Sequence, residues 1–303
     1  MRDAILSFGE NILRGAENVR PLNAPFRHII LCGMGGSSVP GEILSMARTD
    51  AIVHWNYGLP LDTRMQDLVV CVSWSGNTAE TLSGYAAARI LGAPVVVITT
   101  GGELARRATA DGVPAVIIPA DAPAPRLGAG RMTGALFALF GMTDALPQVR
   151  AADLEAEGER LAQAIGQRVP VFYAGYPLRK IAGFFKAMVN ENAKRHAWAS
   201  NFPSAEHNEI MGWQGAYRDA AIPVIVRGAG DDAYATDFAA FVALLEGMGY
   251  TVPTTKVSGN APLEAALNGY ILALWTSYHM AVDLGVDPSD TALIEKFKRL
   301  KTQ

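Results

Sequence analysis

Small hydroxyl side chains gather where a buried strand gives way to a helix. The stretch "SWSGNTAET" follows four apolar residues at 68–71 and carries Ser73, Ser75, Thr78 and Thr81. Hydroxyls and backbone N–H groups at a helix N-terminus suit a phosphate, because the donors and the helix dipole both favour negative charge. The alternative is helix capping by Ser75 or Thr78. Capping accounts for one hydroxyl and not for a run of four, so we favour a phosphate site.

A second loop of this kind, "GMGGSS", begins at Gly33 and carries Gly36 and Ser37. A dinucleotide fingerprint would place glycine where Ser38 stands and an acid at the end of the next strand, which instead reads "HWNYG". Neither loop has the lysine of a Walker-type nucleotide loop. We therefore expect a small phosphorylated ligand rather than a nucleotide.

The elements that position these loops alternate between strand and helix. Apolar runs typical of buried strands occupy 28–33, 51–58, 68–74, 93–100 and 114–120, with helical stretches at 40–49 and 79–92. This alternation predicts an α/β fold with a parallel sheet covered on both faces. Ligands of such sheets bind at the carboxyl ends of the strands, where both loops lie.

A second cycle of the same kind begins at residue 151. Helical patterns cover 151–167, 179–198, 236–250, 263–285 and 289–303, and strand patterns cover 170–176, 222–230 and 251–257. We predict two α/β domains, 1–150 with the phosphate-binding loops and 151–303 after it. An amphipathic helix is expected to open the chain, within residues 1–20.

Composition limits the classes of function. Among 303 residues, 50% are hydrophobic, and 26 basic against 29 acidic residues give a net charge of −3, which argues against a nucleic-acid surface. No segment is typical of a signal peptide or of a membrane span, so we expect a cytoplasmic protein without membrane association. Two cysteines, Cys32 and Cys71, each end a predicted strand and are expected to be buried and reduced.

The quoted motifs carry a family resemblance. "SWSGNTAET" is similar to the phosphosugar-binding signature of sugar isomerase (SIS) domains, and "GMGGSS" resembles a loop of bifunctional phosphoglucose/phosphomannose isomerases. "NENAK" (190–194), "HNEIMGW" (207–213) and "HMAVDLGVDPSDTALIEKFK" near the C-terminus resemble blocks of the same family, in the same order. The resemblance implies two SIS-type subdomains, each a mainly parallel sheet flanked by helices, with C-terminal helices.

The resemblance also implies the chemistry. It is that of an isomerase of carbohydrate metabolism, interconverting glucose 6-phosphate and/or mannose 6-phosphate with fructose 6-phosphate through a cis-enediol(ate). Such a reaction needs a base at C1/C2, an acid/base for ring opening and a cation near the enediolate. By resemblance these roles fall to Glu191 as the base, His207 and Lys298 in ring opening, and Arg126 at the enediolate.

The remaining implications concern the substrate pocket and assembly. Gly36, Ser37, Ser73, Ser75 and Thr78 are implied to hold the sugar phosphate, the small-molecule partner. Thr291 stands where glucose-specific enzymes carry a glutamine, which favours activity on the mannose epimer. The resemblance also implies a homodimer whose active site is shared between subunits. No histidine or cysteine cluster has zinc-like spacing, so we expect neither metal nor other cofactor.

Some alternatives stay open. Arg131 competes with Arg126, because the intervening "LGAGRM" is rich in glycine, with Gly128 and Gly130. Lys298 shares its helix with other basic residues, so a solvated basic surface is the alternative interpretation. Around His207, Ser204 replaces an expected glutamate and Glu206 precedes the histidine directly. A non-catalytic SIS protein that binds a sugar phosphate as a sensor or regulator is the alternative function.

Overall fold

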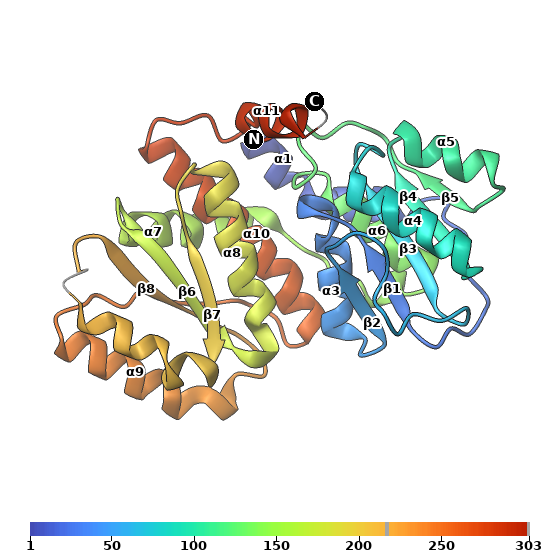
Figure 1. Cartoon of the computed structure of the whole chain (residues 1–303). Helices are drawn as coiled ribbons and strands as arrows, with labels where there is room; N and C mark the ends of the chain where they lie inside the picture. The colour runs from blue at the N-terminus through green and yellow to red at the C-terminus, as the bar shows by residue number, and fades with distance from the viewer. Residues whose placement is uncertain (216–217, 302–303) are drawn as a thin grey trace. The chain divides into compact units, whose positions relative to one another are not determined.

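The computed structural model describes residues 1–215 and 218–301, and the chain divides into two compact units (Figure 1). The N-terminal unit comprises Leu6–Val149, and the C-terminal unit comprises Arg150–Gln303 together with Met1–Ile5. The expected opening helix is two helices, α1 (Arg2–Leu6) and α2 (Phe8–Ala16). Residues 1–5 belong to the C-terminal unit, so the boundary between the two units falls within α1.

The N-terminal unit contains a five-stranded parallel sheet in the order β2-β1-β3-β4-β5. Its strands are β1 (Ile29–Cys32), β2 (Ala51–His54), β3 (Leu68–Ser73), β4 (Val95–Thr99) and β5 (Ala115–Ile117). All residues of β1, β3 and β4 are buried. This explains their continuous apolar sequences, because a central strand of a covered parallel sheet has no solvent face.

Helices cover both faces of this sheet. α4 (Ala79–Leu91) and α5 (Gly102–Ala110) bury Tyr85, Ala88, Leu104 and Ala108 against one face. α3 (Val39–Ala47) and α6 (Ala129–Leu139) contact one another on the other side, where α6 also packs along α2. Cys32 and Cys71 are buried on the α4 face as free thiols, in agreement with the expectation from the sequence.

The C-terminal unit contains a four-stranded parallel sheet in the order β7-β6-β8-β9. Its strands are β6 (Val169–Gly175), β7 (Trp198–Phe202), β8 (Ala221–Arg227) and β9 (Thr254–Lys256). α7 (Glu155–Ile165), α8 (Arg179–Asn192) and α10 (Pro262–Asp283) pack together, while α9 (Ala235–Gly247) places Phe238, Phe241 and Leu245 against the sheet with Tyr173 and Phe202. α11 (Ala292–Leu300) follows. The predicted fold class is confirmed.

One prediction from the sequence is wrong in this unit. The helix predicted over 179–198 ends at Asn192, and its last residue begins β7 instead. Lys194 has a positive φ of 56°, and the Asn190 side chain accepts a hydrogen bond of 3.0 Å from the backbone N–H of Ala197, which together turn the chain. β7 is an edge strand that starts with two exposed residues, so it lacks the buried apolar run that identified the other strands.

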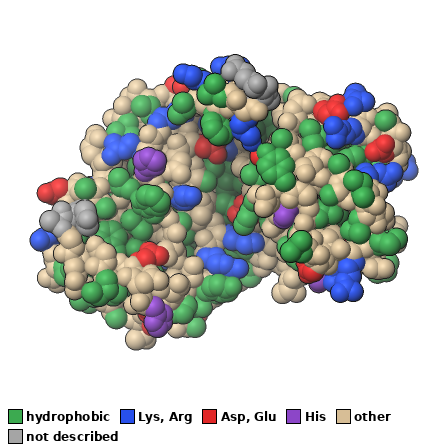
Figure 2. Space-filling view, in the orientation of Figure 1, with side chains coloured by type: hydrophobic (Ala, Val, Ile, Leu, Met, Phe, Trp, Pro, Cys, Tyr) green, Lys and Arg blue, Asp and Glu red, His purple; other side chains and the backbone are tan. Residues whose placement is uncertain are grey.

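No helix within residues 1–215 and 218–301 combines the length and apolar character needed to cross a membrane. On the face shown in Figure 2, Lys and Arg side chains occur in small groups with Asp and Glu among them. That face therefore carries no continuous basic surface.

Candidate functional site

The two hydroxyl-bearing loops lie side by side at the point where the order of the N-terminal sheet reverses. β1 and β3 are neighbours, and the loop with Ser37 follows β1 while the loop from Trp74 to Thr78 follows β3. A Cβ on Gly41 of α3 would meet Leu31, whereas one on Gly84 of α4 would meet Cys32. Successive strand residues face opposite ways, so α3 and α4 cover opposite faces and the loops before them diverge. Open α/β sheets bind ligands in the crevice that such divergence creates.

Hydrogen bonds orient the hydroxyls of these loops. The Ser37 Oγ accepts from the backbone N–H of Trp74 at 3.0 Å, the Ser73 Oγ from Gly76 at 3.1 Å, and the Ser75 Oγ from Asn77 at 3.2 Å. An accepting hydroxyl retains its own proton as a donor. Ser37 and Ser75 therefore each keep a proton to donate.

Thr78 belongs to the same network. The Thr78 Oγ1 lies 2.9 Å from the Ser73 Oγ, so one of their two protons joins the pair and the other remains. Thr78 is also the residue before α4, yet its side chain makes no capping hydrogen bond, and Ser75 bonds outside the helix. Helix capping is therefore not what these two hydroxyls do. The fourth residue of the run, Thr81, is only 1% exposed and faces the core.

Arg126 lies against the first loop. A Cβ on Gly36 would fall 2.3 Å from the backbone nitrogen of Arg126, so the two segments touch through their main chains. Arg126 is only 1% exposed, which makes it a fully buried cation. Gly128, two residues on, has the Trp74 ring where a side chain would stand. The glycines of this segment thus allow close packing of three loops.

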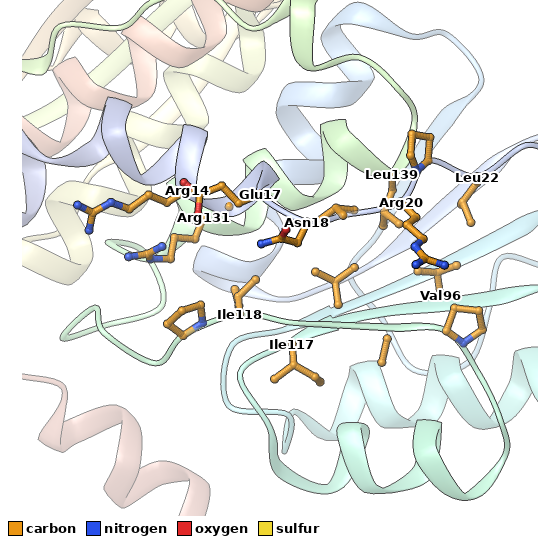
Figure 3. A pocket seen from close by; sticks show the side chains of 17 residues that line it. Arg14, Glu17, Asn18, Arg20, Leu22, Val96, Ile117, Ile118, Arg131 and Leu139 are labelled. Atoms are coloured by element: carbon orange, nitrogen blue, oxygen red, sulfur yellow. The ribbon is translucent and has the colours of Figure 1, made fainter.

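Arg131 occupies a different environment, shown in Figure 3. It lines a cavity of about 730 Å³ together with Arg14, Glu17 and residues of β4 and β5. Its guanidinium forms a bidentate ion pair with Asp121, in which Nε to Oδ1 is 2.8 Å. Of the two candidate arginines, it is Arg126 that the structure places beside the hydroxyl loops.

Glu191 lies in the last turn of α8 and is half-buried. Neighbouring residues of its motif fix this turn: Asn192 is fully buried and donates to the Ser277 Oγ of α10 at 2.8 Å. The Lys194 Nζ donates to the backbone oxygen of Glu191 at 2.6 Å and to that of Asp290 at 2.7 Å. The end of α8 is thereby tied to the segment that precedes α11. The sequence alone assigns Lys194 no role, because nothing in a sequence distinguishes a lysine that donates to two backbone carbonyls from other surface lysines.

His207 projects from a short 3₁₀ helix, Ser204–His207, that follows β7. Its side chain is 77% exposed, and its Nε2 lies 3.8 Å from the Oε1 of Glu206. Glu206, which departs from the family pattern, is therefore within ion-pair distance of His207. Ser204 is exposed at the start of the same turn.

Lys298 and Thr291 belong to the C-terminal helix and its approach. The Lys298 side chain is 64% exposed, and its Nζ donates to the Glu295 Oε1 at 2.8 Å on the same helix. Thr291 precedes α11 without capping it, because the Asp290 Oδ1 accepts from the N–H of Ala292 at 2.8 Å. Thr291 and Lys298 thus stand at opposite ends of one short helix, about 10 Å apart along its axis.

The predicted residues therefore form two groups. Gly36, Ser37, Ser73, Ser75, Thr78 and Arg126 meet within the N-terminal unit. Glu191, His207, Thr291 and Lys298 lie in the C-terminal unit, where Lys194 links the first to the segment with Thr291. In the part of the chain that the structure describes, no three His, Cys, Asp or Glu side chains gather as potential metal ligands.

Two parallel sheets, the first with hydroxyl-rich loops at its switch point, define a protein of the sugar isomerase (SIS) fold class. Residues 154–300 match the family described as bacterial phospho-glucose isomerase C-terminal SIS domain. A putative phosphosugar isomerase from Clostridium difficile 630 has the same fold, with a TM-score of 0.72 over 98% of this chain and 97% of that one, at 12% identity.

Sequence relatives narrow the assignment. A bifunctional phosphoglucose/phosphomannose isomerase of Aquifex aeolicus is 30% identical over 289 residues, or 90% of each chain. A D-glucosamine-6-phosphate 4-epimerase of Sulfolobus acidocaldarius is 35% identical over 209 residues, covering 64% of this chain and 66% of the epimerase. The chain belongs to the bifunctional phosphoglucose/phosphomannose isomerase family. It is a sugar phosphate isomerase, an enzyme of the intramolecular oxidoreductase class.

Proposed function

We propose that this protein is a metal-independent aldose–ketose isomerase that interconverts fructose 6-phosphate with glucose 6-phosphate and/or mannose 6-phosphate. The observation that carries the proposal is the position of Arg126, a buried arginine whose backbone packs against the Gly36 loop beside hydroxyls that keep a proton to donate. A bound phosphate and a developing enediolate are both negatively charged, and both are stabilised by a nearby cation and by hydrogen-bond donors. Domain 1–150 supplies phosphate binding in this proposal, and domain 151–303 supplies the acid/base groups.

Each residue has a defined task in the proposed reaction. Ser37, Ser75 and the Ser73–Thr78 pair, through its one remaining proton, donate to the phosphate, and Gly36 allows the close approach of the loops. His207 and Lys298 act on the ring oxygen and its hydroxyl, and Glu191 carries a proton between C1 and C2 through the cis-enediol(ate). Arg126 stabilises the negative charge of that intermediate. No step requires a metal, so dialysis against a chelator is expected to leave turnover unchanged.

The exposure of His207 supports a shared active site. A side chain that is 77% exposed on a short turn is available to a neighbouring molecule. We propose a homodimer of C2 symmetry in which each histidine serves the site of the other subunit. Mixing Glu191→Gln with His207→Ala under subunit exchange is then expected to restore partial activity, whereas a fully active monomer would contradict the arrangement.

The function is tested by assays with fructose 6-phosphate that follow glucose 6-phosphate and mannose 6-phosphate separately. Glu191→Gln is expected to keep substrate binding and to lower kcat by about 10²- to 10⁴-fold, the usual contribution of a positioned proton-transfer group. Proton exchange between solvent and C1/C2 is expected to stop with it. Substrate binding without any turnover in the unaltered protein would instead favour a sensor or regulator.

A second candidate function arises from the Sulfolobus relative, whose name describes a D-glucosamine-6-phosphate 4-epimerase. Including glucosamine 6-phosphate in the same assays separates the two activities, because epimerisation at C4 gives another aldose and no ketose. A ketose product from glucose 6-phosphate, with no C4 epimer from the amino sugar, would decide for the isomerase.

A further inference from the structure

The C-terminal unit has a cavity of about 670 Å³ where β8 and β9 end. Its wall is formed by Arg227 and the glycine-rich segment after it, by Asp232, and by the chain from Lys256 through Ser258 to Asn260. The volume lies within the range of about 300–1,000 Å³ that small-molecule sites occupy. The carboxyl edge of a parallel sheet is also where open α/β proteins bind their ligands.

Two cations stand side by side in this cavity. Arg227 and Lys256 are register partners on neighbouring parallel strands, so their side chains leave the same face about 4.8 Å apart. The Arg227 Cζ lies 5.3 Å from the centroid of the Phe238 ring, which holds the guanidinium along α9. Within residues 1–215 and 218–301, neither cation has a carboxylate at salt-bridge distance.

The arginines of the cavity in Figure 3 provide a contrast. There Arg131 pairs with Asp121, and Arg14 pairs with Glu10 at the surface, so two of the three arginines that line the cavity have a carboxylate partner. Arg227 and Lys256 are like charges on adjacent strands and, in the described part of the chain, are held in no such ion pair; the carboxylate nearest in the chain, Asp231, attracts Arg227 only at longer range. Adjacent like charges at a cavity are stabilised by a bound anion, and phosphate is the oxyanion that arginine and lysine side chains commonly bind.

Polar groups on the rim of the cavity indicate which chemical groups of the ligand lie beside the phosphate. Asp232 and Asn260 offer oxygens that accept hydrogen bonds from hydroxyl groups. The rim is held in place, because the Asn268 side chain donates to the backbone oxygen of Ser258 at 3.0 Å and to its Oγ at 3.1 Å. Nearby Asp231 is buried, its Oδ2 accepts from the Gly228 N–H at 3.0 Å, and it makes no ion pair with Arg227.

The position of the cavity parallels that of the first site. In the orders β2-β1-β3-β4-β5 and β7-β6-β8-β9, the segment 228–232 after β8 corresponds to the loop 74–78 after β3. The hydroxyls of the first loop have no counterpart in "GAGDD", and the charges of the two strands provide the anion chemistry instead. We propose that this cavity is a second binding site, for a phosphorylated polyol such as a sugar phosphate. Its phosphate lies on Arg227 and Lys256, and its hydroxyls bond to Asp232 and Asn260.

Equilibrium dialysis of the full chain with labelled inorganic phosphate tests the site without depending on turnover. Two phosphates per chain are expected, one lost in Ser75→Ala/Thr78→Ala and the other weakened at least tenfold in Lys256→Ala. Lys256→Arg is expected to stay within threefold of the unaltered protein. Lys186→Ala, which removes an exposed charge from α8, is the matched control and is expected to change neither site.

The outcomes separate this proposal from the proposed function. Loss of all binding in the Ser75/Thr78 double variant, with none lost in Lys256→Ala, would overturn the second site and leave the first intact. Equal weakening of phosphate binding by Lys186→Ala and Lys256→Ala would indicate a general effect of charge and would also overturn the second site. Sorbitol 6-phosphate, which cannot isomerise, is expected to bind the second site at least tenfold more tightly than phosphate; equal affinities would overturn the role of the hydroxyl groups.

Discussion

Gly36→Ala is the most direct test of how the phosphate loop and Arg126 are held together. The added Cβ would lie 2.3 Å from the nitrogen of Arg126 and 2.6 Å from its Cα. Both atoms belong to the backbone, so no rotamer change relieves the clash. The two loops must separate by about 1 Å to reach an ordinary contact distance of about 3.4 Å. Overpacking of this kind lowers the free energy of unfolding by about 1–3 kcal/mol.

The effect on activity is expected to be as large as the effect on stability. A displacement of about 1 Å between binding and reacting groups lowers activity by about 100-fold, equivalent to about 2.7 kcal/mol of transition-state stabilisation. The assay measures kcat/KM for fructose 6-phosphate by coupled oxidation of glucose 6-phosphate, beside unfolding by urea. A KM for fructose 6-phosphate that rises together with a falling kcat would place the damage in both loops.

Gly35→Ala is the matched control, one residue away. Gly35 has a φ of 55°, and no atom lies within 4 Å of the Cβ that would be added. Its substitution costs about 1–2 kcal/mol of backbone strain without pushing any neighbour. We expect Gly35→Ala to lose stability and to keep kcat/KM within about threefold. Equal kcat/KM in the two folded variants would refute the reasoning; if Gly36→Ala does not fold, Arg126→Lys tests the same cation by its effect on kcat.

Three further changes have defined outcomes. Lys194→Met is expected to lower kcat by about tenfold with little change in KM, because it releases the end of α8 from the segment before α11. Lys186→Met, within α8, is the control, and equal effects of the two substitutions would exclude a positioning role for Lys194. Asp67 is buried and accepts a bidentate pair from Arg27, whose hydrogen bonds lower the pKa of the carboxyl in the folded protein. Its contribution to stability is therefore present above the unfolded pKa of about 3.9 and is lost as the pH falls towards the folded pKa. Because Arg27 is a third exposed, Asp67→Asn is expected to cost only about 1–2 kcal/mol near neutral pH in urea unfolding and to make stability less dependent on pH in the acid range; an unchanged acid dependence would contradict this. Thr291→Gln is expected to suppress mannose 6-phosphate turnover more than glucose 6-phosphate turnover, and equal losses would deny the residue a part in substrate breadth.

Of the strands that the structure describes, the sequence predicts all except β7, an edge strand of the C-terminal sheet. β3 and β4 are apolar throughout because they are buried on both faces, and this leaves an unmistakable pattern. β7 begins at the exposed residue Trp198, which the predicted helix still includes, and the turn before it is made by the positive φ of Lys194 and by the Asn190 side chain. A side-chain acceptor such as Asn190 can end a helix without any local signal in the sequence.

The candidate site was predictable as a set of residue types and not as a network. The hydroxyls of Ser73 and Thr78 were identified from their spacing, but their mutual hydrogen bond was not, since it joins residues whose backbone angles the sequence leaves undetermined. The choice between Arg126 and Arg131 likewise needed the structure. Both lie in one glycine-rich stretch, and only packing against Gly36 or pairing with Asp121 separates them.

Under the proposed function, the arrangement of the hydroxyls explains why the phosphate is held by neutral donors where other phosphate loops use lysine. A lysine is a flexible point charge that attracts a phosphate from many directions. Here each of Ser37, Ser73 and Ser75 accepts a backbone N–H, so the direction of its oxygen is set by the loop itself. Under the proposed function, proton transfer occurs at C1 and C2, at the far end of the sugar from the phosphate. On that proposal, a phosphate held by oriented hydroxyls at a fixed strand end determines where the reacting carbons lie, and Arg126 supplies the positive charge for the enediolate.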